Sequence, residues 1–211
     1  MAGYTYTTLR QAIQDYTDNT ESTFVSQIDD FIKNAEERIL KSIAPLEVFR
    51  KNATTSMTSG SKYLPKPSDW LATYTFSIVV SGENKFLLNK DVNLLQEYSP
   101  DPTATGEPKY YADFDVDNFI IAPSPNAAYS AELHYFYRPT SIVDAVSGTT
   151  WIGTNAGPSL LYASLVEAFS FIKGEPDMIQ LYEQKFMQAA ERLSMFAVQA
   201  EGLDTYRKSV A

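Results

Sequence analysis

The sequence contains 211 residues, of which 44% are hydrophobic, 20% are charged and 13% are aromatic. This balance is typical of a folded chain long enough for one large domain or two small ones, and it excludes an intrinsically disordered protein. Asp and Glu number 26 against 17 Lys and Arg, and the formal charge of −9 argues against a protein that grips nucleic acid tightly. The absence of cysteine excludes disulfides, thiolate nucleophiles and cysteine-ligated metal centres. The first residues have neither a cationic start nor an apolar run, so we expect no signal peptide.

The first predicted elements are two helices within residues 6–45. Leu9, Ile13 and Tyr16 are spaced as one face of a short amphipathic helix. A second apolar stripe follows at steps of three and four residues and comprises Phe24, Ile28, Phe31, Ile32, Ala35, Ile39 and Ile43. We expect this stripe to be the core face of a helix that ends just before Pro45.

Two pairs of adjacent carboxylates lie on the second of these helices, Asp29 with Asp30 and Glu36 with Glu37. Paired carboxylates can hydrolyse glycosides when their environments separate their pKa values. Each pair here is followed by basic residues within a turn or two. We therefore interpret both pairs as solvated helix faces.

Residues 46–150 change in character, because Pro, Gly, Ser, Thr and Asn punctuate short β-branched and aromatic runs. Such a pattern is typical of strands joined by turns. The predicted strands are Val48–Met57, Tyr74–Val80, Lys85–Asn89, Tyr110–Phe114, Phe119–Ala122 and Ala128–Tyr137. Residues 81–84 predict a tight connection between two of these strands, and residues 99–108 predict an exposed loop.

Helices return near Pro158, a residue that can open a helix in its first turn. The apolar residues between Leu160 and Ile172 predict a helix buried on more than one side, while its polar residues predict that it does not span a membrane. A Gly-Glu-Pro-Asp turn then separates this helix from a last one, which carries apolar residues at helical spacing from Met178 to Ala200.

Together these elements predict an α+β fold, in which the N- and C-terminal helices form an antiparallel four-helix bundle with a β-rich insertion domain. The expected domains are a discontinuous helical bundle, residues 1–45 with 155–203, and a β-rich insertion, residues 46–154. Residues 204–211 are expected to form a C-terminal tail.

The sequence carries few residues suited to catalysis or metal binding. Its one histidine, His134, lies on a predicted strand without a matching nucleophile motif, and we interpret it as a strand residue partnered by backbone or water. Asp113, Asp115 and Asp117 alternate as cation ligands can, but Asn and Ser stand where an EF-hand needs Gly and Glu. We interpret this segment as a hairpin turn, and a divalent-cation site serving a hydrolase is left open as an alternative. We predict that the protein is not an enzyme and has no catalytic residues, cofactor or metal site.

A carbohydrate- or ligand-binding module is a second class of function to consider. Trp70, Trp151 and the tyrosines of the β-rich region could stack on sugar rings. This alternative requires the two tryptophans to lie outside the core.

Several landmarks in a fixed order carry a resemblance to a known family. They are Lys62–Leu71, Gly106–Tyr111, Phe119–Pro125 and Ala131–Arg138, followed by the helical stretches Pro158–Ile172 and Asp177–Ala200. In this order, over residues 6–200, the sequence resembles the adaptor, or head-to-tail connector, proteins of tailed bacteriophages, which include the tail tubular protein A-like proteins of short-tailed phages.

The resemblance implies a structural virion protein that assembles as a ring of about twelve copies beneath the portal, joins the head to the tail and lines the DNA channel. The implied partners are the portal protein, the next tail component (a nozzle or tail tube protein), further copies of the chain and, transiently and without sequence specificity, genomic DNA; no membrane is implied. The implied location is the neck or tail of the virion, after assembly in the host cytoplasm. Because the C-terminal segment of such proteins reaches the portal, Tyr206, Arg207 and Lys208 are the expected portal contacts.

The distribution of charge agrees with this expectation. Each of the three regions, 1–45, 46–150 and 151–211, contains more acidic than basic residues. A channel wall of this sign makes only weak contacts with phosphates, so that DNA can slide past it.

Overall fold

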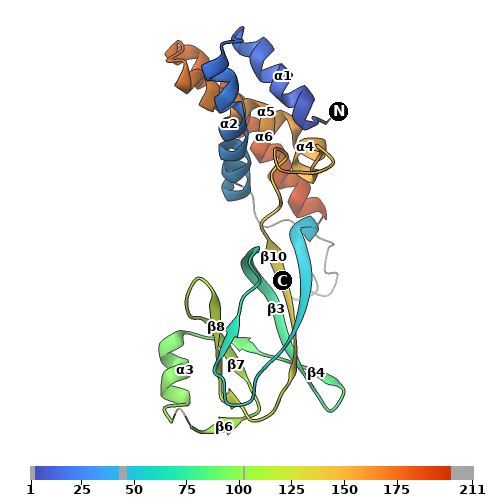
Figure 1. Ribbon diagram of the computed structural model, residues 1–211, viewed down its shortest axis with the longest axis vertical. Helices are drawn as coiled ribbons and strands as arrows, with labels where there is room; N and C mark the ends of the chain where they lie inside the picture. Colours follow the sequence, from blue (N-terminus) through green and yellow to red (C-terminus); the bar gives the residue numbers. More distant parts are fainter. Residues whose placement is uncertain (1–2, 43–46, 102, 201–211) are drawn as a thin grey trace, which may run out of the picture. The chain divides into compact units, whose positions relative to one another are not determined.

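The computed structural model describes residues 3–42, 47–101 and 103–200, which form two compact units (Figure 1). Unit 1 contains the helices that precede Val48 and those that follow Pro139, and unit 2 comprises Val48–Pro139. In the sequence, unit 2 is therefore inserted between two parts of unit 1. Among the described residues, no helix is both long enough and apolar enough to cross a bilayer.

The described part of unit 1 contains α1 (Tyr6–Thr17), α2 (Ser22–Ser42), α4 (Trp151–Asn155), α5 (Gly157–Phe171) and α6 (Pro176–Ala200). α1 begins with a capping box, in which the hydroxyls of Thr5 and Thr8 each accept the backbone N–H of the other residue. It ends at Asp18, whose φ of 45° lies in the left-handed region.

The turn between α5 and α6 uses its residues differently from the sequence-based expectation. Lys173, with φ of 53°, adopts the left-handed conformation that a glycine usually supplies at a helix end. Gly174 is needed for space instead, since a Cβ at this position would lie 2.8 Å from a ring carbon of Phe169.

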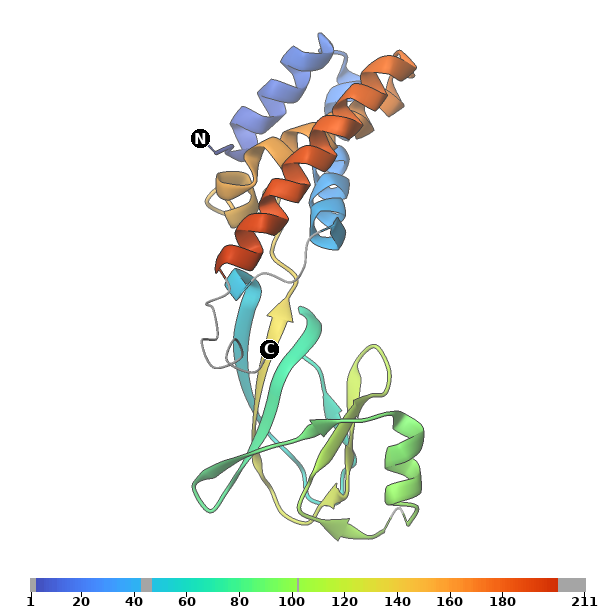
Figure 2. The same cartoon turned by 180° about the vertical axis from the view of Figure 1, so that it is seen from behind.

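The helices of unit 1 pack around α5, which contacts α1, α2, α4 and α6 (Figure 2). Ten residues of α5 are buried, which agrees with its prediction as a helix covered on more than one side. The apolar stripe of α2 is also buried as predicted, from Phe24 to Ile39. The predicted packing of N- and C-terminal helices is thus confirmed. A four-helix bundle is not clearly defined, because α5 is the common partner of the other helices.

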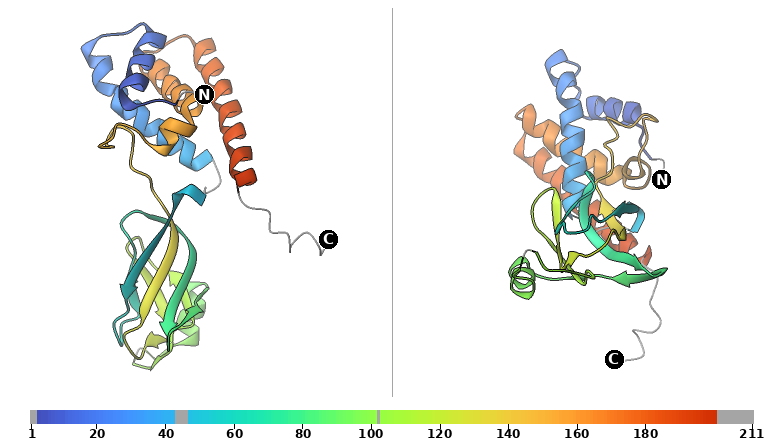
Figure 3. Two further views of the ribbon diagram at one scale, coloured as in Figure 1. Left: turned by 90° about the vertical axis from the view of Figure 1, so that its right-hand side faces the viewer. Right: turned by 60° about the horizontal axis from the view of Figure 1, so that its bottom comes forward.

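Unit 2 contains two four-stranded sheets. The first has the order β1 (Arg50–Ser56), β10 (Ser130–Tyr137), β3 (Trp70–Val80) and β4 (Glu83–Phe86), and all of its pairs are antiparallel. Figure 3 shows β10, in yellow, between β1 and β3. The second has the order β2 (Tyr63–Pro65), β8 (Asn118–Ala122), β7 (Tyr110–Asp113) and β5 (Leu88–Asn89), and its β5–β7 pair is parallel.

The remaining elements of the described part of unit 2 are the helix α3 (Val92–Tyr98) and a short parallel pair of β6 (Thr105–Gly106) with β9 (Ser124–Pro125). A 3₁₀ turn at Glu47–Phe49 spans the boundary between the two units in the sequence. The sequence did not predict α3. Asp91 caps it by accepting the N–H of Asn93.

The core of unit 2 is formed by both sheets. Alternate residues of β10 (Ala131, Leu133 and Tyr135) are buried, as expected for a strand with one face on the core. From the second sheet, Leu64, Tyr111, Phe119 and Ile121 pack in the same cluster. A separate cluster of Leu95, Ala112, Ile120 and Ala122 lies under α3, so α3 covers residues of β7 and β8 that point away from the first cluster.

The six predicted strands are present with shifted ends. β3 begins at Trp70, four residues before the predicted Tyr74, and the predicted strand Lys85–Asn89 is divided into β4 and β5. The tight β3–β4 connection has Ser81 and Gly82 at φ of 54° and 88°, which is the pattern of a two-residue hairpin turn.

Candidate functional site

Asp69, in the segment between β2 and β3, holds the start of β3 to two other strands. Its carboxylate accepts hydrogen bonds from Lys51 Nζ on β1 at 2.6 Å and from Tyr135 Oη on β10 at 2.7 Å. Its backbone carbonyl accepts the N–H of Arg138 at 2.8 Å. Asp69, which lies in the landmark segment Lys62–Leu71, therefore connects the start of β3 to β1, to β10 and to the residue that follows β10. We call these contacts the Asp69 clamp.

The surroundings of Asp69 and Tyr135 keep the Asp69 carboxyl ionised and the Tyr135 phenol protonated at neutral pH. Burial raises the pKa of the Asp69 carboxyl, but the hydrogen bonds from Lys51 and Tyr135 outweigh it, and the net pKa is below the ordinary value. Burial, together with the hydrogen bond to Asp69, raises the pKa of Tyr135 to about 12. A general acid or base needs a pKa near the working pH, so this pair is suited to anchoring and not to proton transfer.

Lys66 forms a second contact between distant parts of unit 2. Only 5% of its side chain is exposed, and its ammonium lies 4.1 Å from the centre of the Trp70 ring and 5.1 Å from that of Phe119. The ammonium donates to the backbone carbonyl of Asp115 at 2.7 Å and lies 3.5 Å from an Asp113 carboxylate oxygen. These contacts compensate for the loss of water around a buried cation and join the β2–β3 segment to the β7–β8 hairpin.

The segment with Asp113, Asp115 and Asp117 is a hairpin, as predicted, with β7 and β8 antiparallel. The Asp115 carboxylate accepts the backbone N–H groups of Asp117 at 2.8 Å and Asn118 at 2.6 Å, which closes the turn. Within residues 3–42, 47–101 and 103–200, no group of three His, Asp or Glu side chains is placed to hold a metal ion. The three carboxylates of Asp113, Asp115 and Asp117 therefore do not converge as the cation-site alternative required.

The other residues of interest are also committed to local contacts. His134 lies on β10 as predicted, but its imidazole Nε2 is 3.3 Å from the Glu132 carboxylate, a partner that the sequence did not suggest. Trp70 is half-buried, packs edge-on against Phe119 and carries Lys66 over its ring. Trp151 begins α4 in unit 1. Both tryptophans are half-buried, so neither lies fully outside the core, and one face of Trp70 is already occupied by Lys66.

The prediction that both carboxylate pairs of α2 are solvated is wrong for Glu36. This residue is 6% exposed, and its Oε1 accepts the N–H of Ile142 at 2.9 Å, while its Oε2 has no partner among the described atoms. Burial raises the pKa of Glu36, although hydrogen bonds from Ser141 and Ile142 oppose the increase. Glu36 therefore anchors the segment through which the chain re-enters unit 1 after unit 2.

Glu36→Gln is expected to become more stable relative to the natural protein as the pH rises. The raised pKa means that folded Glu36 binds its proton more tightly than in the unfolded chain. Its contribution to stability is present below the unfolded pKa of about 4.3 and is lost as the pH rises through the folded pKa. Urea unfolding at several pH values between 4 and 7 measures this difference. Glu191→Gln, at an exposed position of α6, is the matched control; a Glu36→Gln difference that does not change with pH contradicts the interpretation.

The expected portal contacts, Tyr206, Arg207 and Lys208, lie outside the described residues.

The polar residues described above, Asp69, Lys66, Asp115 and Glu36, hold strands, turns and helices together. Such a structural use of polar groups is typical of a protein without a catalytic site. A family model described as SU10 adaptor protein matches residues 4–209. The chain therefore belongs to the SU10 adaptor protein family: it is a non-enzymatic, structural adaptor of a phage virion and binds other virion components. The resemblance seen in the landmark segments is confirmed at this level. No curated protein matches the sequence.

Proposed function

We propose that the chain assembles as a ring of about twelve copies beneath the portal, joins the head to the tail and lines the channel through which DNA passes. The observation that carries this proposal is the family match over residues 4–209. The proposed domains are the helical bundle, residues 1–45 with 155–203, the β-rich insertion, 46–154, and the tail, 204–211. The compact units of the structure divide the chain at residues 48 and 140.

The edges of the sheets in unit 2 support contacts between copies. β4 pairs with β3 on one side, and within the described residues no strand pairs with its other side. Phe86, at the end of β4, is 64% exposed, and Leu88, at the start of the edge strand β5, is 58% exposed. An open strand edge with apolar side chains is a surface that proteins cover by association. We assign this edge to the contact with the neighbouring copy in the ring.

The remaining partners follow from the proposed position in the neck or tail. The ring binds the portal protein on one side and the next tail component, a nozzle or tail tube protein, on the other, after assembly in the host cytoplasm. Tyr206, Arg207 and Lys208 are the proposed portal contacts. The net charge of −9 supports transient, non-specific contact with genomic DNA, because an acidic wall does not retain phosphates.

Phe86→Asp is expected to weaken ring formation at least about tenfold, because the substitution removes a large apolar contact and places a charge at the interface. Native mass spectrometry and electron microscopy of the chain mixed with the portal protein of the same phage measure the ring. An electron microscopy map of the natural complex also shows whether residues 206–208 contact the portal.

Val116→Asp is the matched control, because Val116 is 88% exposed in the β7–β8 turn of the same unit. This variant is expected to form rings as the natural protein does. If Phe86→Asp forms rings at the same protein concentration as the natural chain, the assignment of the β4 edge is wrong. If the natural chain forms no ring on the portal, the proposed function is wrong.

A further inference from the structure

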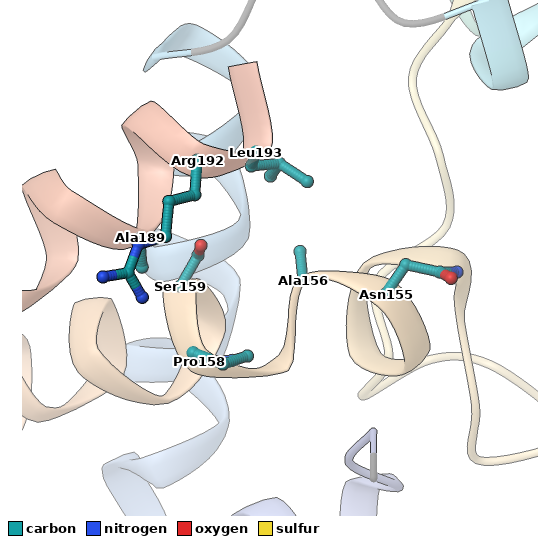
Figure 4. A pocket seen from close by; sticks show the side chains of 7 residues that line it. All are labelled: Asn155, Ala156, Pro158, Ser159, Ala189, Arg192 and Leu193. Carbon is teal, nitrogen blue, oxygen red and sulfur yellow. The ribbon is translucent and has the colours of Figure 1, made fainter. Parts of the chain in front are cut away.

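A cavity of about 300 Å³ lies in unit 1 between the start of α5 and the middle of α6 (Figure 4). Ala156, Pro158, Ala189 and Leu193 supply apolar walls. Three polar side chains lie at the same cavity, Asn155 from α4, Ser159 from α5 and Arg192 from α6. The amide of Asn155 donates to the backbone carbonyl of Trp151 at 3.0 Å. The site thus combines a largely apolar lining with one amide, one hydroxyl and one cation.

The start of α5 leaves the positive end of a 15-residue helix without a side-chain cap. The residue at the N-cap position is Ala156, which has no group that could accept a backbone N–H. Pro158 follows within the first turn, where it contributes no N–H of its own. The N-terminal ends of helices favour anions through the helix dipole and their unpaired N–H groups. A helix start alone does not define a site, and two further observations point to a ligand.

The first observation is the hydroxyl of Ser159. Ser159 is 2% exposed, and within the part of the chain that the structure describes its hydroxyl makes no hydrogen bond. The two other serines of α5 behave differently: Ser164 donates to the carbonyl of Leu160, and Ser170 donates to that of Val166. Figure 4 shows the Ser159 oxygen directed from α5 toward α6. This oxygen is not sealed off from solvent, so either water or a ligand in the cavity can supply a hydrogen bond to it.

The second observation is the guanidinium of Arg192. This side chain extends from α6 toward the start of α5, next to Ser159 (Figure 4). Arg192 is exposed, and it makes no ion pair with any described residue, unlike the less exposed Arg38, which pairs with Glu183 in the same unit. A solvent-exposed cation, a hydroxyl without a hydrogen bond to any described residue and a helix N-terminus therefore meet at one cavity, and all three favour an anion.

We propose that this cavity binds a carboxylate on a short apolar stem, namely a glutamate side chain in an acidic segment of another virion protein. A single arginine matches the single charge and planar fork of a carboxylate, and the apolar walls match the methylene stem. A nucleic acid backbone is a poorer fit, because it requires several cations along a polar groove. The choice of a protein as the occupant rests on the adaptor role of the chain. The binding of a carboxylate in the cavity does not require that the chain forms a ring.

The test is an NMR titration of the full ¹⁵N-labelled chain with the blocked tripeptide acetyl-Ala-Glu-Ala-amide. The expected result is a shift of the amide resonances of Ser159 and of its neighbours in the cavity. The Gln counterpart of the peptide is expected to bind about tenfold more weakly, because it lacks the charge that strengthens the hydrogen bonds. Equal binding of the two peptides, or binding of inorganic phosphate in preference to the Glu peptide, overturns the proposal.

Two variants locate the site. Arg192→Gln is expected to weaken binding of the Glu peptide about tenfold and Ser159→Ala about fivefold, with both chains folded as judged by circular dichroism. Lys90→Gln, an exposed position in unit 2, makes the same change of net charge and is expected to bind as the natural chain does. Unchanged binding by Arg192→Gln overturns the proposal.

Sedimentation of the same samples tests a competing occupant. If the natural chain self-associates and Arg192→Gln does not, the cavity binds a second copy of this chain. That result overturns the proposal that another virion protein is the occupant. The titration uses neither portal nor ring, so its outcome is independent of ring formation. Peptide binding by a chain that forms no ring supports the cavity proposal and contradicts the proposed ring. Ring formation by a chain that does not bind the peptide supports the ring and contradicts the cavity proposal.

Discussion

Phe119→Ala is expected to lower the free energy of unfolding of unit 2 by about 3–5 kcal/mol, the usual cost of removing a buried aromatic ring. Phe119 is fully buried, and its ring centre lies 5.7 Å from that of Trp70, 5.6 Å from that of Phe76 and 5.8 Å from that of Tyr111. The same ring supports the ammonium of Lys66. Alanine therefore leaves a cavity at the point where both sheets and the buried lysine meet.

Urea denaturation of the full chain measures this loss, with Trp70 fluorescence as the reporter of unit 2 in a Trp151→Phe background. Phe86→Ala is the matched control, because this phenylalanine is in the same unit and is mostly exposed. The control is expected to change the stability by less than about 0.5 kcal/mol. Similar losses for the two variants would show that Phe119 is not a central core residue.

Asp69→Asn is expected to lower the pKa of Tyr135 from about 12 part of the way toward its ordinary value of 10.0, because burial still raises this pKa but the phenol no longer donates to a carboxylate. The variant is also expected to lose about 1–2 kcal/mol of stability at pH 7, since an uncharged amide replaces the carboxylate that accepts hydrogen bonds from Lys51 and Tyr135 at a partly exposed site. NMR of chains with ¹³C-labelled tyrosine rings measures the first effect and urea denaturation the second.

The pH dependence of the Asp69 effect has the opposite sign to that of Glu36. The folded pKa of Asp69 is lowered, so its stabilising contribution is present above the unfolded pKa of about 3.9 and is lost as the pH falls through the folded pKa. Asp117→Asn, at an exposed turn position of the same unit, controls for the change of charge. A Tyr135 pKa that stays near 12 in Asp69→Asn contradicts the clamp.

Long periodic segments were predictable from the sequence. The apolar stripe of α2 repeats at three and four residues through Ile39, and the alternation of β10 places Ala131, Leu133 and Tyr135 on one face. In both cases the buried face is a property of neighbouring residues along the chain. α3 lacked such a signal, because seven residues with one buried leucine, Leu95, contain too little periodicity to distinguish a helix from a loop.

Long-range partners of polar residues were not predictable. Glu36 lies four residues after Ile32 and three before Ile39, so helical spacing already places it in the apolar stripe, yet its partner is the N–H of Ile142, far along the chain. Lys66 and Asp69 lie in the landmark Lys62–Leu71, but their partners are on β1, β10 and the β7–β8 hairpin. No short spacing encodes such contacts. The lack of a partner for Ser159 is likewise visible only in three dimensions.

The pairing of β1 with β10 also affects how the chain can fold. Arg50 is paired with Phe136, so the chain enters and leaves unit 2 on adjacent strands, with Cα atoms roughly 5 Å apart. The whole of unit 2 lies in the sequence between α2 and α5, which must meet to form unit 1. When unit 2 is folded, it shortens the loop that this meeting has to close. A substitution that unfolds unit 2 therefore also raises the entropic cost of assembling the helices, without touching any of them.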